Sequence, residues 1–537
     1  MSTASLAIKR LVAQVHAEVI AGDDDERQAL ARVLGRLDIE PGDAAWADGR
    51  DVVGEAFEQL VPTAARRRLG QFFTPLWAAR PMAEWLLAEP ADLLLDPGIG
   101  SGSLMIGVAQ ARGDRLTRLL GLDIDPLALD MARTTQRVRA IDGLELRQAN
   151  FLIDELAERP QAIICNPPYT RHQDIPADLK AAIHHGLSSR YGRTFSRLAS
   201  LHVLFLLRAL EVGAENARIA FLTPGHWLDM NYAREVKALL LERAHVEALI
   251  SFPVKDRVFD HAATTAGVTL IRKGVPGEHP TRVIQLRSTA SAEAGLRAAI
   301  GGAAPARKVV LRSDRRWSGR QTHAAAQGIT LGELARVRRG IATGCNAFFV
   351  LSEARRRELG IDVGHVVPCI ASPKHFAGTT LRRADLTAMD DSTPRWLLHL
   401  NKAPKSGPLA SYLRRGHTEF AVGDRTLVCQ RVKAGRKWFQ VELDVPAPIL
   451  FRYLNSSPAR FVRNLAGAAP LNNWLAIQPR AGVEADRLFA VLEELAESTA
   501  LEEDSRHYGK GLWKLEPREL RDLTLPPSAS RLTPIVG

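Results

Sequence analysis

The chain has 537 residues, more than one ordinary hydrophobic core holds, so its length predicts two domains. A composition that is 46% hydrophobic and 24% charged is typical of a soluble globular protein. The formal net charge of +11 points to a polyanionic partner. Charge alone does not separate DNA, RNA or an anionic membrane from a basic surface that binds nothing.

The cysteines give no sign of a zinc site or a disulfide framework, because they show no CxxC spacing and no nearby histidine: Cys165, Cys345, Cys369 and Cys429. The first twenty residues lack the charged-then-apolar order of a signal peptide. The longest apolar stretch, 201–210, is interrupted by polar residues and is too short to cross a bilayer. We therefore expect a cytoplasmic protein with no membrane partner and no metal.

In chain order, residues 1–65 form a predicted helical segment, with the acidic run 23–26 as a break or cap. From residue 92, short apolar runs alternate with helix-length stretches. The predicted strands are 93–96, 119–124, 144–150, 162–165, 218–223, 246–252 and 267–272. The predicted helices between them are 102–112, 126–139, 198–213 and 231–242. This alternation indicates a doubly wound α/β domain with a mostly parallel sheet and helices on both faces.

The end of this domain is marked by GVPGEHP (274–280), and GGAAPA (301–306) is interpreted as a linker. Beyond residue 310 predicted strands and helices alternate less regularly, and basic clusters lie among aromatic residues. The sequence therefore predicts an amino-terminal helical segment (1–65), a catalytic domain (66–300) and a second domain (310–537).

The first stretch that carries chemistry is DPGIGSG (96–102), directly after a predicted strand and before a predicted helix. Its glycines let the backbone turn tightly and approach a ligand at the carboxyl edge of the sheet. A P-loop is excluded because no Gly-Lys-Ser/Thr follows. The GxGxG spacing also departs from the GxGxxG of dinucleotide-binding proteins.

Asp123, in GLDIDP, ends the next predicted strand. A carboxylate in that position accepts both hydroxyls of a ribose, which suits S-adenosylmethionine as well as NAD. Together the two features favour a nucleotide-like cofactor. The alternative is a tight structural turn followed by an aspartate that caps a helix.

The decisive element is Asn166-Pro167-Pro168-Tyr169, directly after the strand AIIC. An adenine amine is a poor nucleophile because its lone pair is delocalised into the ring. The Asn166 amide oxygen and the Pro167 carbonyl can each accept one amine hydrogen and stabilise a pyramidal nitrogen. Two prolines stiffen the loop, and Tyr169 offers a stacking surface for a flipped base. Cys165, which precedes the loop without a histidine partner, is interpreted as buried and inert.

On these residues the sequence resembles the N6-adenine DNA methyltransferases of the gamma arrangement, in which cofactor motifs precede NPPY and a DNA-recognition domain follows. The resemblance implies a seven-stranded S-adenosylmethionine-dependent methyltransferase sheet. RRRLGQFFTP (66–75) resembles the family's upstream motif, and NPPYTRHQ (166–173) its catalytic loop with a basic extension. The implied catalytic residues are Asn166, Pro167, Pro168, Tyr169 and Phe259. The implied cofactor contacts are Gln71, Phe72, Thr74, Pro75, Asp96, Pro97, Gly98, Gly100, Gly102, Asp123, Ile124, Asn150, Phe151 and Asn166.

Phe259 takes its role from VFDHAATTAGVTLI (258–271), which resembles the segment whose phenylalanine stacks on the flipped adenine; Phe252 is the alternative. Asn150 stands where the family commonly has an aspartate that binds the cofactor's adenine amine, and its amide oxygen can still accept that bond. The carboxyl half is similar to target-recognition domains fused to these enzymes. The expected partner of the chain is duplex DNA. The expected contacts are Arg171 in the extension of the catalytic loop and, in the carboxyl half, Arg338, Arg339, Arg431, Lys433, Arg436 and Lys437.

Three rival readings remain. NPPY loops also occur in enzymes that methylate release-factor glutamines and in some RNA methyltransferases, but the upstream motif and the long carboxyl half argue against them. A DNA-binding module without catalysis conflicts with the intact DPGIGSG and NPPY. A fused nuclease has no room in the first 65 residues. A separately encoded restriction endonuclease or defence protein stays open as a partner.

Overall fold

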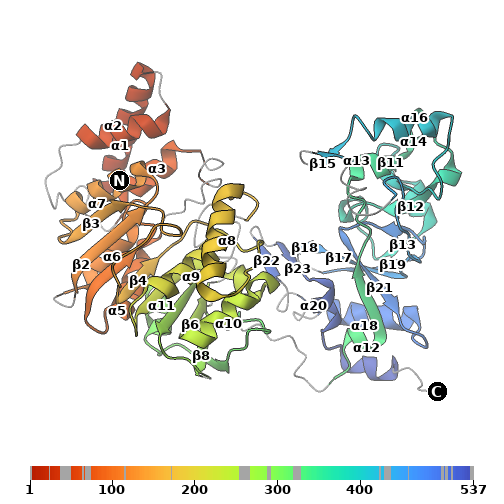
Figure 1. Ribbon diagram of the computed structural model, residues 1–537. Helices are drawn as coiled ribbons and strands as arrows, with labels where there is room; N and C mark the ends of the chain where they lie inside the picture. Colours follow the sequence, from red (N-terminus) through yellow and green to blue (C-terminus); the bar gives the residue numbers. More distant parts are fainter. Residues whose placement is uncertain are drawn as a thin grey trace. The chain divides into compact units, whose positions relative to one another are not determined.

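The computed structural model divides into two compact units, Met1–Gly319 and Arg320–Gly537 (Figure 1). Each unit is described by itself. The described residues are 3–22, 25–36, 50–62, 66, 74–113, 116–170, 172–252, 266–277, 279–286, 292–318, 328–422, 425–427, 437–456, 459–497, 501, 506–508 and 512–532.

A nine-stranded sheet forms the centre of the first unit. Its strands are β1 (Ala91–Asp96), β2 (Leu116–Asp123), β3 (Leu144–Gln148), β4 (Ala162–Cys165), β5 (Arg218–Pro224), β6 (Ala244–Ser251), β7 (Ala266–Lys273), β8 (Pro280–Gln285) and β9 (Arg307–Val310). Their spatial order is β3-β2-β1-β4-β5-β7-β6-β8-β9. The first five strands pair in parallel, and β7 runs antiparallel between β5 and β6.

The doubly wound α/β fold is confirmed, but the expected number of seven strands is wrong. β8 pairs in parallel with β6, and β9 adds an antiparallel edge. GVPGEHP, taken as the end of the domain, is the turn between β7 and β8. GGAAPA, taken as a linker, joins a helix to β9. Both added strands are only partly buried, so neither produces the continuous apolar run that marks the inner strands.

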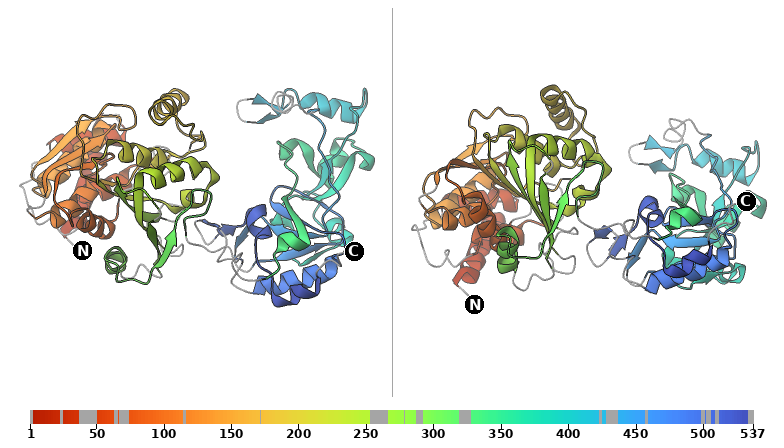
Figure 2. Two further views of the ribbon diagram at one scale, coloured as in Figure 1. Left: turned by 60° about the horizontal axis from the view of Figure 1, so that its bottom comes forward. Right: turned by 90° about the horizontal axis from the view of Figure 1, so that it is seen from below.

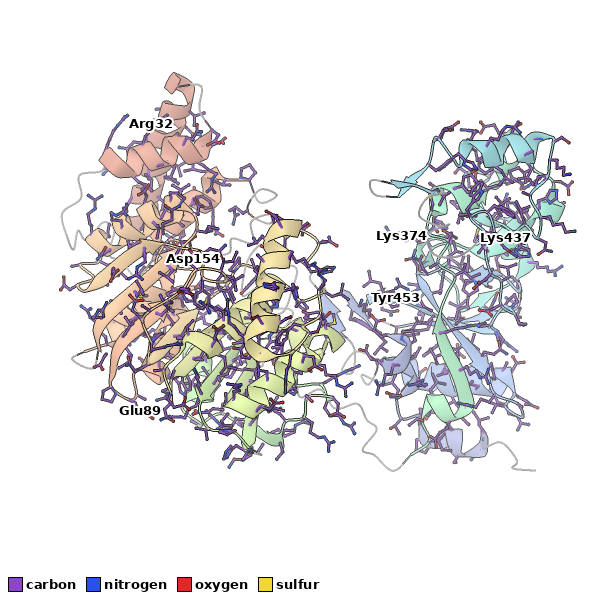
Figure 3. All side chains as sticks on the ribbon, in the orientation of Figure 1. Arg32, Glu89, Asp154, Lys374, Lys437 and Tyr453 are labelled. Carbon is purple, nitrogen blue, oxygen red and sulfur yellow. The ribbon has the colours of Figure 1, made fainter. Side chains whose placement is uncertain are left out.

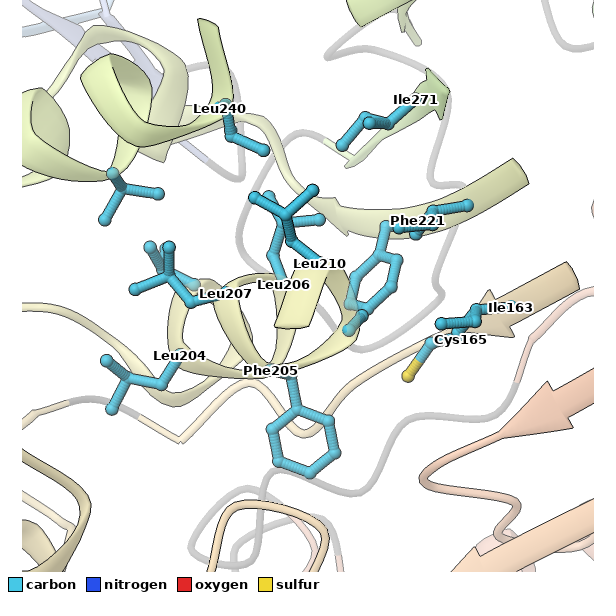
Figure 4. Close-up of a cluster of buried hydrophobic side chains, with 14 of the residues drawn as sticks. Ile163, Cys165, Leu204, Phe205, Leu206, Leu207, Leu210, Phe221, Leu240 and Ile271 are labelled. Atoms are coloured by element: carbon cyan, nitrogen blue, oxygen red, sulfur yellow. The ribbon is translucent and has the colours of Figure 1, made fainter. Parts of the chain in front are cut away.

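Helices cover both faces of this sheet (Figure 2). One core contains side chains from the helices α5 (Leu76–Leu86), α6 (Ser103–Ala111) and α11 (Ala292–Ile300). The other core contains side chains from α8 (Ala177–Tyr191), α9 (Leu201–Val212) and α10 (Arg234–Arg243). Figure 4 shows α9 with Leu206 and Leu210 near Phe221 of β5. Two apolar layers therefore hold the strand ends in fixed positions.

The amino-terminal helices pack on the outside of α7 (Pro126–Val138). They are α1 (Thr3–Gly22), α2 (Glu26–Arg36) and α3 (Val52–Leu60). Their apolar faces share one core with Leu127, Ala128 and Met131 of α7. Since α7 starts three residues after β2 ends, this core lies beside the end of that strand.

The second unit is an α+β assembly of small sheets. The larger sheet contains β10 (Ala335–Arg339), β21 (Trp474–Pro479), β17 (Ile449–Arg452), β19 (Phe461–Asn464) and β13 (Thr380–Leu381), in that order. A four-stranded sheet contains β11 (Val350–Ser352), β14 (Pro394–Leu398), β12 (Val366–Ile370) and β20 (Ala469–Pro470). The chief helices are α16 (Pro408–Arg415) and α18 (Ala485–Glu497). No helix in the described part of either unit is apolar and long enough to cross a bilayer.

Gly107 sets the spacing of α6 and α5, the helices that follow the glycine loop and the Thr74-Pro75 segment. A Cβ at Gly107 would lie 2.6–2.7 Å from backbone and side-chain atoms of Ala79 and from the backbone nitrogen of Arg80. We expect Gly107→Ala to destabilise the protein by about 1–3 kcal/mol, a fall of several degrees in Tm by calorimetry. Gly35→Ala on α2, where the added Cβ meets nothing within 4 Å, is the control and should hold or raise Tm. An unchanged Tm for Gly107→Ala contradicts this packing.

Candidate active site

A cavity of about 490 Å³ opens at the carboxyl ends of the central strands. Strand order reverses between β1 and β4, so their following loops diverge and leave a crevice where doubly wound folds bind ligands. Segments after β1, β2, β3 and β4 all contribute to the cavity wall. The topology thus gathers four loops that are distant in the sequence.

The glycine loop after β1 is held against the end of β2. Gly100 and Gly102 have positive φ angles of 56° and 87°, a backbone region that favours glycine. Gly100 N donates a hydrogen bond to Asp123 Oδ2 at 3.0 Å. Gly98 and Gly100 line the cavity, whereas Gly102 caps α6 outside the wall.

The Asp123 carboxylate is a half-buried acceptor in the cavity wall. Its Oδ1 accepts from Asp125 N at 3.0 Å, and burial raises its pKa. Ile124, next to it, is 61% exposed and lines the same cavity. A carboxylate beside an exposed apolar side chain suits a ligand that carries hydroxyls next to a flat apolar ring.

Asp96 is fully buried beneath this wall and does not line it. Its Oδ1 accepts from Gly98 N at 3.3 Å. Its Oδ2 has no hydrogen-bond partner among the described residues. Burial raises the pKa of Asp96 to about 8. The fold therefore holds an acid in its neutral form at pH 7, close to the loop that lines the cavity.

The NPPY loop after β4 enters the cavity through Asn166 and Pro168, while Pro167 and Tyr169 lie outside its wall. The hydroxyl of Tyr169 donates to the Leu222 carbonyl at 3.3 Å, and its ring meets His202 edge-on at 6.2 Å. These contacts hold the Tyr169 ring in a half-buried position rather than in the cavity. Tyr169 therefore does not line this cavity, and its role as a stacking surface for a flipped base stays a prediction.

Cys165 lies at the end of β4 under this loop and is fully buried. Figure 4 shows its side chain with Ile163 and Phe221. Burial raises the pKa of its thiol well above the ordinary value, so the thiolate is suppressed. Cys165 is a packing residue and not a nucleophile.

Asn150 and Phe151, after β3, complete the fourth side of the cavity. Asn150 Oδ1 accepts from Leu152 N at 3.1 Å, which uses one of its two lone pairs. Phe151 packs against Phe205 at 5.4 Å. The Asn150 amide keeps one acceptor position for a ligand.

The structure gathers ten of the predicted site residues in this wall: Thr74, Pro97, Gly98, Gly100, Asp123, Ile124, Asn150, Phe151, Asn166 and Pro168. Pro75 instead caps α5. Phe252, the alternative stacking residue, is 2% exposed and packs edge-on against Trp77 at 5.2 Å, which is a core position. The residues that lie outside the described part of the chain are Gln71, Phe72, Arg171, Phe259, Arg431, Lys433 and Arg436.

Several wall residues were not predicted from the sequence. Asp174, Ile175, Pro176 and Leu179 follow the NPPY loop directly, so proximity to that loop was an available signal. Leu201 and Phe205 belong to α9. Because this helix is strongly apolar, its sequence predicts packing in the core and gives no sign of a cavity wall. Arg27 of α2 lies 98 residues from its ion-pair partner Asp125, and no local pattern marks it.

The basic residues predicted to contact DNA have separate settings in the second unit. Arg338, on the edge strand β10, pairs with Asp444 at 2.6 Å. Arg339 donates from Nε to the Asn472 carbonyl at 3.0 Å and lies over the ring of Tyr453 at 4.1 Å. Both arginines line a second cavity of about 230 Å³. Lys437 is exposed; Lys437 and Tyr453 are labelled in Figure 3.

Within the described ranges, no group of three or more histidine, cysteine, aspartate or glutamate side chains could hold a metal ion.

Family comparisons agree with this geometry in both units. Residues 48–294 match the family described as N-6 DNA Methylase. Residues 305–534 match the C-terminal domain of the Type II methyltransferase M.Eco57I. Residues 48–294 therefore belong to the N-6 DNA Methylase family.

Two relatives extend along most of the chain. The Type II methyltransferase M.AccI of Acinetobacter calcoaceticus is 25% identical over 491 residues, covering 86% of this chain and 86% of its own length. M.XamI of Xanthomonas campestris pv. amaranthicola is 29% identical over 472 residues, covering 86% and 85%. The structure of the restriction-modification enzyme MmeI in complex with DNA aligns with 91% of this chain and 72% of its own, at a TM-score of 0.53 and 13% identity, which shows a shared fold.

The buried Asp96 generates a test of stability against pH. Its carboxyl is protonated in the folded chain up to about pH 8 but ionises near 3.8 when unfolded, so its cost to stability grows as pH rises between these values. Asp96→Asn should raise the Tm of the protein without ligand by a few degrees at pH 8, and by less at pH 5.

The matched control is Asp92→Asn, at an exposed position of the same strand, which should show no gain that grows with pH. A Tm for Asp96→Asn that lies below the wild-type value at pH 8 contradicts this account.

Proposed function

We propose that the enzyme transfers the methyl group of S-adenosylmethionine to the N6 amine of a flipped adenine at a specific site in duplex DNA. The observation that carries this proposal is a shared cavity wall. Asn166 and Pro168 of the NPPY loop face the same space as Asp123 and the glycine loop. A cofactor site and a site for a planar amine therefore adjoin, as direct transfer between them requires.

The residues present fit S-adenosylmethionine. The Asp123 carboxylate suits two ribose hydroxyls, exposed Ile124 suits a face of adenine, and Asn150 keeps an acceptor for the adenine amine. The buried Asp96 Oδ2 has no partner among the described residues, and a positively charged ligand near the glycine loop would favour the ionised form of this acid. When bound, the cofactor supplies an electrophilic methyl group on a positively charged sulfur.

The chain's own groups would activate the target amine. The Asn166 amide oxygen and the Pro167 carbonyl accept its two hydrogens, which draws the nitrogen toward a pyramidal geometry and frees its lone pair. Pro167 and Pro168 stiffen the loop that carries these two acceptors. Apolar wall residues, Leu179, Leu201 and Phe205, exclude water from the same space.

DNA is the proposed substrate because charge and relatives agree. The net charge is +11, and Arg338 and Lys437 are exposed in the second unit. The relatives that span most of the chain are Type II methyltransferases. By contrast, the release factor glutamine methyltransferase of Xylella fastidiosa matches 29% of this chain at 26% identity. A protein substrate would leave the second unit without a role.

Asn166→Ala should slow methyl transfer by about 100-fold or more, while the dissociation constant for S-adenosylmethionine changes little. The principal contact of the amide is with the target amine, so its loss appears mainly in the rate. Single-turnover transfer of labelled methyl groups to DNA and calorimetric titration of the cofactor separate the two effects. Turnover near the wild-type rate would overturn the role of Asn166.

Asp123→Ala should have the opposite signature. Hydrogen bonds from ribose hydroxyls to a carboxylate contribute about 1.5–3 kcal/mol, so cofactor affinity should fall by about 10-fold or more. Transfer at saturating cofactor should stay within a few-fold of the wild type. An unchanged dissociation constant would show that other groups hold the ribose.

A further inference from the structure

The amino-terminal helices touch the cavity at a point that the family match does not include. The N-6 DNA Methylase match begins at residue 48, whereas Arg27 on α2 lines the cavity. The helix is docked there by apolar packing: Ala29, Leu30 and Val33 of α2 share a core with Ala128 and Met131 of α7. Arg27 is therefore held beside the end of β2 by the packing of its own helix.

The two terminal nitrogens of Arg27 have different surroundings. Nη2 donates to Asp125 Oδ2 at 2.5 Å. Nη1 is buried and has no hydrogen-bond partner among the described residues. The guanidinium carbon also lies 5.6 Å from the centre of the Phe57 ring of α3. Nη2 of the guanidinium is thus held by Asp125, whereas the N–H donors of Nη1 have no acceptor among the described residues.

The anchor places Arg27 at the ribose end of the cavity. Asp125 accepts from Arg27, caps α7 by accepting from Leu127 N, and donates its own N–H to Asp123 Oδ1 at 3.0 Å. A single chain of hydrogen bonds therefore joins Arg27 to the carboxylate proposed to hold the ribose. Buried guanidinium donors without an acceptor are costly, which favours a ligand that brings one.

A second contact ties the same helical segment to the glycine loop. Asp51, which caps α3 and is 7% exposed, accepts hydrogen bonds from the hydroxyls of Ser101 and Ser103 and from Gly54 N at 2.9 Å. Ser103 lines the cavity. The amino-terminal segment therefore contacts the cavity wall at two points, through Arg27 and through Asp51. These contacts hold it in place beside Asp123 and the glycine loop.

We infer that Arg27 is a direct ligand of the cofactor and donates from Nη1 to a hydroxyl oxygen of the ribose. This inference rests on the proposed use of S-adenosylmethionine. It makes the amino-terminal helices part of the cofactor site, with the Arg27–Asp125 pair orienting the donor. A charge-assisted hydrogen bond of this kind corresponds to about a 10- to 100-fold change in affinity.

The test uses the full-length chain and calorimetric titration of S-adenosylhomocysteine and of its 2′-deoxy and 3′-deoxy analogues. Arg27→Gln should bind S-adenosylhomocysteine about 10-fold or more weakly than the wild type. Its affinity should fall little further for the analogue that lacks the hydroxyl bound by Arg27, whereas the wild type loses affinity for that analogue. Arg36→Gln, at an exposed position of the same helix, is the matched control and should bind as the wild type does.

Equal affinity of Arg27→Gln and the wild type would overturn the inference. An equal further loss on both deoxy analogues would also overturn it, because Arg27 would then act away from the ribose. If Arg27→Gln fails to fold, Arg27→Lys, which keeps the charge but not the forked geometry, should show the same non-additive pattern. A wild-type chain that binds neither S-adenosylmethionine nor S-adenosylhomocysteine would instead contradict the proposed function itself.

Discussion

The hydrogen bond from Gly100 N to Asp123 Oδ2 joins the loop after β1 to the end of β2, and the site depends on it. Gly100 adopts a positive φ to point its N–H at the carboxylate, which is why a glycine stands there. The bond closes one side of the crevice left where strand order reverses between β1 and β4. It also orients a carboxylate whose other oxygen is held by Asp125 N.

Several buried acidic side chains lie around this bond, and their burial lowers the stability of the folded protein when they are ionised. Burial raises the pKa of both Asp96 and Asp123, and Asp51 behind the loop is shifted in the same direction. An interior selected only for stability would not keep Asp96 Oδ2 without a partner among the described residues. A cationic cofactor nearby would recover part of this cost, so the site trades stability of the empty protein for affinity.

The inner architecture could be predicted from the sequence because buried parallel strands read as short apolar runs. The strands up to β7 and the glycine and NPPY loops follow from such runs and from the residues that end them. β8 and β9, at one end of the sheet, were not predicted because half-exposed strands carry no continuous apolar signal. The position of Tyr169 outside the cavity wall was not predicted, because it depends on the carbonyl of Leu222, 53 residues away. Arg27 was missed for the same reason, since its ion pair spans 98 residues.

The most direct test of the central claim is a map of modified bases in living cells. The gene is expressed in a bacterial host without DNA methylation of its own, and the genome is read by single-molecule sequencing. The account predicts N6-methyladenine at one recurrent sequence with the wild-type chain and none with Asn166→Ala. A wild-type genome without methylated adenine, or the same methylation pattern with Asn166→Ala, would contradict it.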